Sequence, residues 1–296
     1  MKVAVTGAGG LLGRAVKTHC AAHSDEVHAF DHRALDITNA AAVKSQLTAL
    51  KPEVVFNCAA WTDVDGCESD PSRAESANAL GPQLLASTCR EIGALLITIS
   101  TDYVFDGAKD GFYTQRDHPN PISVYGRFKF EGERRAQTAY ARTIVVRSGY
   151  IFGAEGTNFL STVLDRARRG ARLKAISDMT GTPTYAPDLA ARLRELAEFD
   201  LPGIYHVVNA GDGVSFETFA RTALKLGGVD PGLLQSTTLA ELERPAPRPR
   251  NSRLRCLLSE AIGLPPLRNW QAALEDFVTS QSGTDKPPTA AASPTG

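Results

Sequence analysis

The chain of 296 residues lacks several features that would assign it to a specialised class of protein. No apolar run approaches the roughly 20 residues needed to cross a bilayer, and we expect no signal peptide before the first apolar segment. The net charge is only −1, from 32 basic and 33 acidic residues, so no overall field attracts nucleic acid or an anionic membrane. We therefore expect a cytoplasmic protein that binds neither nucleic acid nor membranes.

Cysteine and histidine are scarce and show no ligand spacing. Five cysteines without a CxxC pair predict reduced thiols rather than a disulfide framework or a zinc site. The six histidines are scattered, so no metal site is predicted. What remains is 43% hydrophobic and 22% charged, which is typical of a globular protein with a sizeable core.

The first half of the sequence alternates short apolar runs with helical patterns. The runs that predict buried strands are residues 3–5, 27–30, 53–57, 95–99 and 143–147. Alternation of strand and helix predicts an α/β fold with a doubly wound parallel sheet, the Rossmann type. In such folds ligands bind at the carboxyl ends of the strands.

The pattern changes after about residue 148. Helical patterns at residues 159–169, 188–199, 216–226 and 270–278 are joined by Gly- and Pro-rich connections. We expect residues 1–148 to form a dinucleotide-binding domain and 149–281 to form mostly a smaller C-terminal substrate-binding lobe. Residues 282–296, rich in Ser, Thr, Pro and Ala, predict a disordered tail.

A glycine-rich turn follows the first predicted strand. Its spacing is Gly7, Gly10 and Gly13, and it opens the first predicted helix. Glycines there permit a tight turn and close approach of the backbone to a pyrophosphate, while the helix N-terminus offers free N–H groups. The triplet alone is weak evidence for a site. Its place at the first strand-to-helix turn predicts a dinucleotide site.

The end of the second predicted strand bears on cofactor choice. Asp31 lies where an acid accepts a hydrogen bond from the adenosine ribose and favours NAD. His32 and Arg33 follow directly, and a guanidinium there would neutralise the 2′-phosphate of NADP. The sequence therefore predicts NADPH or NADH and leaves the choice between them open.

Three residues have side chains suited to carbonyl reduction. Tyr125 and Lys129 are four apart within a predicted helix, so both lie on one face. A phenol has a pKa of about 10, and a neighbouring ammonium is expected to lower it toward neutrality. Thr101 follows the fourth strand, where a hydroxyl would hydrogen-bond a substrate carbonyl or simply cap a turn. Found together with the glycine turn, this set predicts an oxidoreductase.

Longer segments resemble the dTDP-4-dehydrorhamnose reductase family of extended short-chain dehydrogenases. The matching segments are residues 57–68, 100–107, 125–133, 181–184, 203–206 and 248–254. The resemblance runs from residue 1 to about 278. It implies NAD(P)H-dependent reduction of the C4 keto group of dTDP-4-dehydro-L-rhamnose to dTDP-L-rhamnose, for surface polysaccharide synthesis.

The resemblance also implies the roles of individual residues. Tyr125 would donate the proton and Lys129 would hold the nicotinamide ribose, with Thr101 beside them. The residues that would line the cofactor, besides Tyr125 and Lys129, are Gly7, Gly10, Leu11, Leu12, Gly13, Asp31, Asp36, Ile37, Ala60, Trp61 and Thr62. The residues that would touch the sugar are Thr101, Asp102 and Tyr150.

Some positions depart from the family pattern. Tyr150 stands where the family often has Trp, which leaves the identity of the sugar open. Ala15 stands where some members have a Glu that binds Mg²⁺ between subunits. We therefore expect a monomer or a weak homodimer without a metal bridge. Asp178 and Met179 replace a frequent Asp-Gln pair.

Other functions remain open. One alternative is a reductase of another nucleotide 4-keto-6-deoxysugar, and another is an epimerase or dehydratase. Asp102 is followed by Tyr103 rather than a second acid, which disfavours dehydration. A third is a non-catalytic regulatory homologue of the methionine adenosyltransferase beta-subunit type, against which the intact Thr101, Tyr125 and Lys129 weigh.

Two further features of the C-terminal half lead to predictions. The arginine-rich run at residues 244–255 fits a diphosphate-binding role and a solvated loop equally well. Trp270 begins the last predicted helix and is expected to lie in the core.

Overall fold

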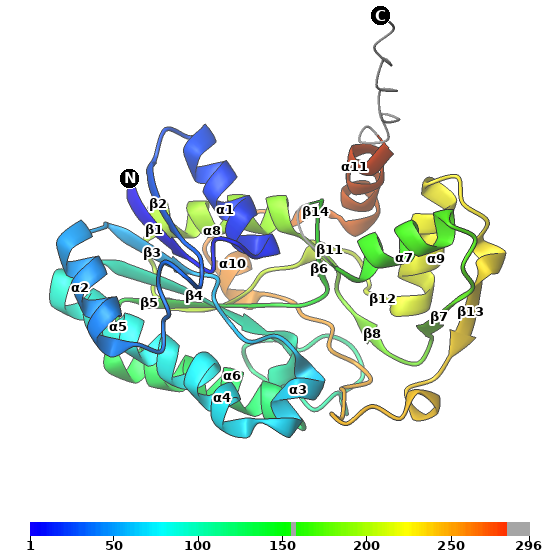
Figure 1. The fold of residues 1–296 in the computed structure, drawn as a ribbon, viewed down its shortest axis with the longest axis horizontal. Coiled ribbons are helices and arrows are strands. Elements are labelled where there is room, and N and C mark those ends of the chain that lie inside the picture. Colours follow the sequence, from blue (N-terminus) through cyan, green and yellow to red (C-terminus); the bar gives the residue numbers. More distant parts are fainter. Residues whose placement is uncertain (155–157, 283–296) are drawn as a thin grey trace, which may run out of the picture.

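The computed structural model of the protein describes residues 1–154 and 158–282. Its centre is a six-stranded sheet in the order β10-β5-β4-β3-β1-β2, in which each neighbouring pair is parallel (Figure 1). The strands are β1 (Lys2–Thr6), β2 (Glu26–Phe30), β3 (Val54–Asn57), β4 (Leu95–Thr101), β5 (Thr143–Ser148) and β10 (Gly203–His206). The strand order reverses between β1 and β3, and ligands bind at such a reversal, outside the carboxyl ends of the strands.

Helices cover both faces of this sheet (Figure 1). One face is covered by α1 (Leu11–Ala22) and α8 (Ala186–Phe199). The other is covered by α2 (Ala40–Leu50), α5 (Gly81–Ile92) and α6 (Val124–Ala139). Val16 and Leu193 are fully buried on the first side, and Leu47 and Leu85 on the second. The predicted doubly wound α/β sheet is confirmed.

Local sequence explains where several helices begin and end. α2 starts after Asn39, whose side chain accepts a hydrogen bond from the backbone N–H of Ala42 at 3.0 Å. α6 starts after Ser123, whose hydroxyl accepts from the backbone N–H of Gly126 at 3.1 Å. α5 ends at Gly93, whose φ of +75° is the left-handed conformation that glycine adopts without strain. The cap at Ser123 fixes the start of the helix that carries Tyr125 and so positions this side chain.

Short helices and small sheets make up the remainder. The helices are α3 (Val64–Ser69), α4 (Pro71–Glu75), α7 (Phe159–Arg168), α9 (Phe216–Leu226), α10 (Leu257–Ala261) and α11 (Trp270–Ser282). The paired strands are β6 (Ile151–Phe152) with β9 (Thr184–Tyr185), β7 (Leu173–Ile176) with β13 (Leu234–Thr237), β8 (Thr180–Gly181) with β12 (Val214–Ser215), and β11 (Asn209–Ala210) with β14 (Leu267–Asn269). A π-helix (Ser76–Leu80) joins α4 to α5, and a 3-10 helix, η2 (Asp102–Val104), follows β4.

A second apolar core lies between α7, α9 and α11, on the right in Figure 1. Its centre is aromatic: Phe152 packs edge-on against Phe219 and Phe277, and Phe219 packs edge-on against Trp270. Trp270 is 6% exposed, so its predicted place in the core is confirmed. This core supports the elements that face the carboxyl ends of the main sheet.

The chain returns to the main sheet after its first excursion into the smaller lobe. β10 pairs in parallel with β5, and α8 packs on α1. The sequence marked residues 203–206 as a family segment but did not predict them as a strand. The boundary at residue 148 remains a prediction. Two segments that come after it in the sequence, α8 and β10, nevertheless pack on or belong to the main sheet.

Other predictions concern the whole chain. All five cysteines are free, as predicted. Within residues 1–154 and 158–282, no helix has the length and apolar character to cross a membrane. Apart from Ser282, which ends α11, the predicted tail at 282–296 lies outside the described residues.

Candidate active site

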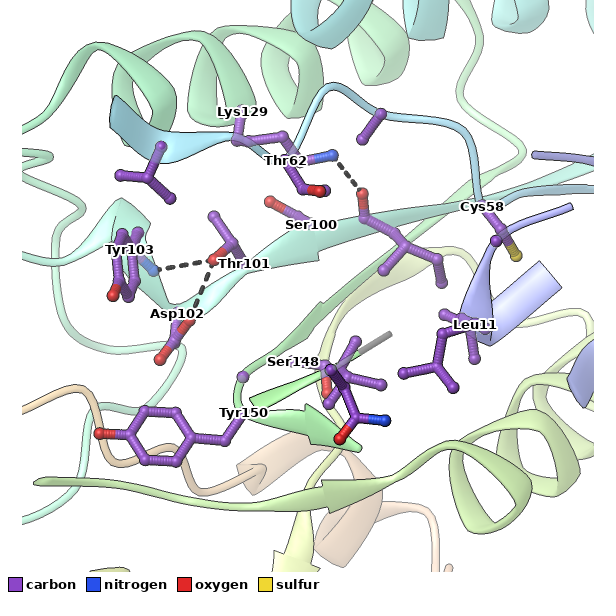
Figure 2. Close-up of a pocket in the computed structure, with 18 of the residues that line it drawn as sticks. Leu11, Cys58, Thr62, Ser100, Thr101, Asp102, Tyr103, Lys129, Ser148 and Tyr150 are labelled. Atoms are coloured by element: carbon purple, nitrogen blue, oxygen red, sulfur yellow. Dashed lines mark hydrogen bonds between the residues drawn. The ribbon is translucent and has the colours of Figure 1, made fainter. Parts of the chain in front are cut away.

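Two neighbouring cavities lie at the carboxyl ends of the main strands. The larger, of about 880 Å³, extends from the glycine turn to the end of β2 and to α4. The smaller, of about 520 Å³, lies between the ends of β4 and β5 and the smaller lobe (Figure 2). Both are lined by Gly10, Cys58, Ala59 and Ala60. The turn after β1 and the end of β3 therefore form the border between them.

Every site residue predicted from the sequence lines at least one of these cavities. The larger is lined by Gly7, Gly10, Asp31, Asp36, Ile37, Ala60 and Trp61. The smaller is lined by Gly10, Leu11, Leu12, Gly13, Ala60, Thr62, Thr101, Asp102, Tyr125, Lys129 and Tyr150. The structure thus brings the predicted residues together, while the role of each one stays a prediction.

The glycine turn has the geometry of a phosphate cradle. Gly7 has a φ of +66°, and a Cβ there would lie 2.6 Å from the backbone nitrogen of Ala59. A Cβ on Gly13 would overlap the carbonyl oxygen of Gly7. Among the described residues, no side chain caps α1 at Gly10, and its first turn holds no acid. The first N–H groups of α1 therefore stay available to an anion, so these residues fit the pyrophosphate of a dinucleotide.

The far end of the larger cavity contains both an acid and cations. Asp31 Oδ1 accepts hydrogen bonds from the backbone N–H groups of Arg33 at 3.0 Å and Ala34 at 2.8 Å. Arg33 itself lines the cavity, as does Arg73 of α4, whose guanidinium lies 4.4 Å from the centre of the Trp61 ring. Sequence reasoning missed Arg73, because only the fold places α4 beside the glycine turn.

Thr101 and its neighbours form a connected group at the end of β4. Thr101 Oγ1 donates to Asp102 Oδ1 at 2.9 Å and accepts from the backbone N–H of Tyr103 at 3.2 Å (Figure 2). A Cβ on Gly126 would overlap the carbonyl oxygen of Tyr103, so α6 lies in close contact with this segment. That close packing brings Tyr125 to the side of Thr101.

The pKa of Tyr125 shifts in the direction opposite to our prediction. Burial raises it, and a side-chain hydrogen bond with Thr101 opposes that rise only in part. Lys129 does not offset the effect, since its Nζ donates instead to the carbonyl oxygen of Ile99 at 2.7 Å. Burial also lowers the pKa of Lys129 to about 8, although Glu133 opposes this shift. The predicted lowering was wrong because spacing along a helix says nothing about how deeply both groups are buried.

Lys129 and Tyr150 approach the cavity from opposite sides in Figure 2, with Thr101 and Asp102 between them. The Tyr150 ring stacks on Phe216 at 3.9 Å between centroids. A Cβ on Gly181 would lie 2.6 Å from the Tyr150 ring, so a glycine is needed there.

The aromatic wall of the smaller cavity also includes two residues that sequence reasoning missed, Phe216 and Phe159. They pack edge to face at 5.0 Å between centroids. Both begin helices of the smaller lobe, and no local pattern shows that these helix starts face the cavity. Their position gives the wall opposite Lys129 an aromatic character.

Part of the arginine-rich run forms ion pairs within the protein. Asp65 pairs with Arg248 at 2.8 Å and with Arg244 at 3.1 Å. These hydrogen bonds, above all the one from Arg248, lower the Asp65 pKa to about 2. Arg255 pairs with Glu260. These pairs join the run to α3 and α10. The side chains of Arg244 and Arg255 stay 51% and 60% exposed, which fits the solvated-loop interpretation, and a diphosphate-binding role of the run remains a prediction.

No group of His, Cys, Asp and Glu able to hold a metal ion is found in the part of the chain that the structure describes. Ala15, on α1, offers no metal ligand in its side chain.

The fold and the site define a short-chain dehydrogenase/reductase, with a glycine-turn cradle, a Tyr-x-x-x-Lys pair and a threonine at the end of β4. More narrowly, the chain belongs to the family described as RmlD substrate binding domain, which matches residues 1–282.

Individual relatives agree with this family. The chain is 41% identical over 286 residues to a dTDP-4-dehydrorhamnose reductase of Streptomyces griseus, covering 94% of this chain and 93% of the relative. It is 37% identical to a probable dTDP-4,6-dihydroxy-2-methyloxan-3-one 4-ketoreductase of Streptomyces antibioticus, covering 98% of each. A crystal structure of dTDP-4-dehydrorhamnose reductase from Bacillus anthracis, in complex with NADP, is 30% identical with a TM-score of 0.91, covering 95% of this chain and 100% of that one.

Proposed function

We propose that this protein is an NAD(P)H-dependent reductase of the C4 keto group of dTDP-4-dehydro-L-rhamnose, producing dTDP-L-rhamnose for surface polysaccharide. The observation that carries the proposal is that Thr101, Tyr125 and Lys129 line one cavity. That cavity meets the cradle at Gly10, where a dinucleotide would be held. The names of the relatives supply the sugar nucleotide and, in the Bacillus anthracis structure, NADP.

Residues of both cavities would hold the cofactor, which supplies a hydride when bound. The N–H groups at the start of α1 would bind its pyrophosphate, Asp31 would bind the adenosine ribose, and Arg33 would bind a 2′-phosphate. Asp36, Ile37 and Trp61 line the larger cavity and would contact the adenine. Lys129, whose Nζ donates to the carbonyl oxygen of Ile99 on β4, would hold the nicotinamide ribose.

Tyr125 holds and delivers the proton. Because burial raises its pKa, the phenol keeps its proton at neutral pH. A keto oxygen becomes a far stronger base when negative charge develops on it during reduction, and it then accepts the proton from Tyr125. Thr101 is hydrogen-bonded to Asp102 and positions the carbonyl beside the phenol.

The smaller lobe binds the sugar nucleotide. Asp102 accepts from a sugar hydroxyl, and Tyr150 with Phe216 offers a flat apolar surface to the hexose or the base. We therefore assign residues 1–148 to the dinucleotide domain and 149–281 mostly to the substrate lobe, apart from α8 and β10. We further propose a cytoplasmic protein that is a monomer or weak homodimer without a metal bridge.

A second candidate is reduction of a different dTDP-4-keto-6-deoxysugar. Two observations favour it: the Streptomyces antibioticus relative named as a probable 4-ketoreductase, and Tyr150 where the family often has Trp. The same site residues would act in the same way, and only the sugar-facing wall would differ.

A single assay panel tests both candidates. The protein is mixed with NADPH or NADH and enzymatically made dTDP-, UDP- or GDP-4-keto sugars, and loss of nicotinamide absorbance is followed. dTDP-4-dehydrorhamnose should give the highest kcat/KM. A higher value with another sugar would select the second candidate, and no consumption with any sugar would remove the reductase proposal.

Tyr125→Phe tests the proton donor. Turnover should fall by about 10²–10⁴-fold, the usual contribution of a general acid, while NADPH binding measured by fluorescence stays within about twofold. Tyr113→Phe is the matched control, since Tyr113 is also a buried tyrosine but its hydroxyl donates to Asp106 outside both cavities. An active Tyr125→Phe protein would mean that another group delivers the proton.

A further inference from the structure

Ser252 belongs to the conspicuous Arg-Pro-x-Asn-Ser segment, yet the proposed reaction gives it no role. It is fully buried, at 0% exposure. Its hydroxyl oxygen is one of the few buried side-chain atoms of the described residues that lack a hydrogen-bond partner of normal geometry. Asp102 Oδ2 is another, on a side chain that is 3% exposed. Buried polar atoms without partners are rare, because each carries the full cost of losing water.

The two orphan groups act on each other. The nearby Ser252 hydroxyl lowers the Asp102 pKa, against a larger effect of burial that raises it to about 6. A Cβ on Gly149 would lie 2.5 Å from Asp102 Oδ2, so the backbone there leaves room for this oxygen. Neither atom has another hydrogen-bond partner, so a hydrogen bond between the hydroxyl and the carboxylate would satisfy both.

The backbone holds Ser252 rigidly behind Asp102. The N–H of Ser252 donates to the carbonyl oxygen of Thr180 at 2.9 Å. The neighbouring Asn251 side chain donates to the carbonyl oxygen of Gly111 at 2.7 Å. Ser252 is thus held between a strand of the smaller lobe and the loop after η2. Its full burial keeps it away from substrate, so any effect on the reaction passes through Asp102.

We propose that Ser252 is a positioning residue, whose hydroxyl donates to Asp102 Oδ2 and thereby directs Asp102 Oδ1 to the hydroxyl of Thr101. Thr101 already donates its hydrogen to Asp102 Oδ1 at 2.9 Å. Thr101 is also the side-chain hydrogen-bond partner of Tyr125. Ser252 therefore positions Asp102 and, through Asp102, the threonine that lies beside the proton donor.

Phenols surround Asp102 but do not titrate with it. Tyr103, Tyr125 and Tyr150 are each coupled to Asp102 by charge, and burial raises the pKa of all of them. They stay neutral across the range in which Asp102 ionises. A titration near pH 6 at this site is therefore assigned to the carboxylate alone.

The charged side chains on neighbouring elements have other partners. Arg248 lies on the same segment as Ser252 and pairs with Asp65 at 2.8 Å. Lys129, from α6, donates to the carbonyl oxygen of Ile99. The side chains that lower the Asp102 pKa are instead those of Ser252 and Thr101.

The test measures the titration of Asp102 directly in the full chain. Protein labelled with ¹³C at aspartate carboxyl carbons is titrated without cofactor, and Asp102→Asn identifies the signal. Ser252→Ala should move the midpoint upward by about one pH unit, the size of one hydrogen bond to a charged group. The matched control is Ser259→Ala, since Ser259, on α10, is also buried but its hydroxyl donates to Cys256 Sγ. It should leave the midpoint unchanged.

An activity arm separates this proposal from the proposed function on which its catalytic meaning rests. If the protein reduces a 4-keto sugar, the acidic limb of kcat/KM should rise with the midpoint in Ser252→Ala and not in Ser259→Ala. An inactive parent protein would refute the proposed function, while the titration would still decide the role of Ser252. An unmoved Asp102 midpoint, or the same shift in both variants, would overturn the positioning role.

Thermal unfolding shows whether Ser252→Ala has folded. If it has not, Ser252→Cys keeps the shape of the side chain with a weaker donor. The midpoint should then move in the same direction by a smaller amount. No movement in that variant would equally overturn the proposal.

Discussion

Replacement of Glu133 by Gln tests how the helix that carries Tyr125 and Lys129 is anchored to the sheet. Glu133 on α6 forms two hydrogen bonds with Arg147 on β5, at 2.9 Å from Nε and 2.7 Å from Nη2. Their side chains are 2% and 3% exposed. The Arg147 guanidinium also lies over the ring of Phe105, 5.2 Å from its centre. The pair is therefore a fully desolvated link between helix and strand.

The expected loss of stability follows from that burial. Gln keeps the size of Glu but removes its charge, which leaves the Arg147 guanidinium buried without a counter-ion. Removal of one partner from a buried pair costs about 3–5 kcal/mol. In a chain of this length we expect the midpoint of thermal unfolding to fall by roughly 10 °C.

The matched control lies on the same helix. Glu131 pairs with Arg135 at 2.9 Å, but their side chains are 33% and 30% exposed. Glu131→Gln should therefore cost less than about 1 kcal/mol. Urea unfolding, followed by circular dichroism, gives the free energy of unfolding of each variant against the parent protein.

Activity provides a second measurement. Glu133 raises the pKa of Lys129, so its neutralisation should move that pKa further below about 8. If Lys129 acts as an ammonium, the alkaline limb of kcat/KM should shift to lower pH in Glu133→Gln alone. Equal stability of the two variants would refute our account of the anchor.

Further predictions concern the turn, the cofactor and pH. Gly13→Ala should abolish NADPH binding in a fluorescence titration, because the added Cβ overlaps the Gly7 carbonyl oxygen. The control Gly9→Ala should still bind NADPH, because its Cβ meets only the Asp31 side chain at 3.5 Å. Binding of NADPH by both variants would contradict the steric argument. Arg33→Ala should weaken NADPH by about fivefold and spare NADH, and an equal loss would argue against its phosphate role. The buried Lys129 has its pKa lowered from 10.5 to about 8, so its contribution to stability is complete above 10.5 and lost as pH falls through 8. That loss is on the order of 3 kcal/mol, and Lys129→Met should remove this pH dependence from urea unfolding curves.

The sequence predicted much of the main sheet because its strands are short apolar runs with glycine or polar residues at their ends. Five of the six strands were predicted within a few residues. The sequence did not predict β10. Gly203–His206 is a short strand, and it comes after α8, far along the chain from the other strands of the main sheet. The helix at 216–226 was predicted with the bounds that the structure shows, because Phe219, Ala220 and Ala223 give it a clear apolar face.

The cofactor side of the site was predictable for a topological reason. Gly7, Asp31 and Thr101 each come at or directly after the end of a parallel strand, and such ends meet at one edge of a sheet. Phe216 and Ser252 come from loops and helix starts of the smaller lobe, whose position depends on how the lobe packs on the sheet. The raised pKa of Tyr125 likewise depends on depth of burial, which helical spacing does not encode.

The return of the chain through α8 and β10 has a consequence for protein engineering. β10 forms the edge of the main sheet next to β5, although it is encoded between two segments of the smaller lobe. A transplant of residues 149–281 as one cassette would also replace the edge strand of the host sheet and the helix packed on α1 with those of the donor. A chimera that exchanges sugar preference should instead splice two separate stretches, one before α8 and one after β10, and leave the intervening helix and strand native.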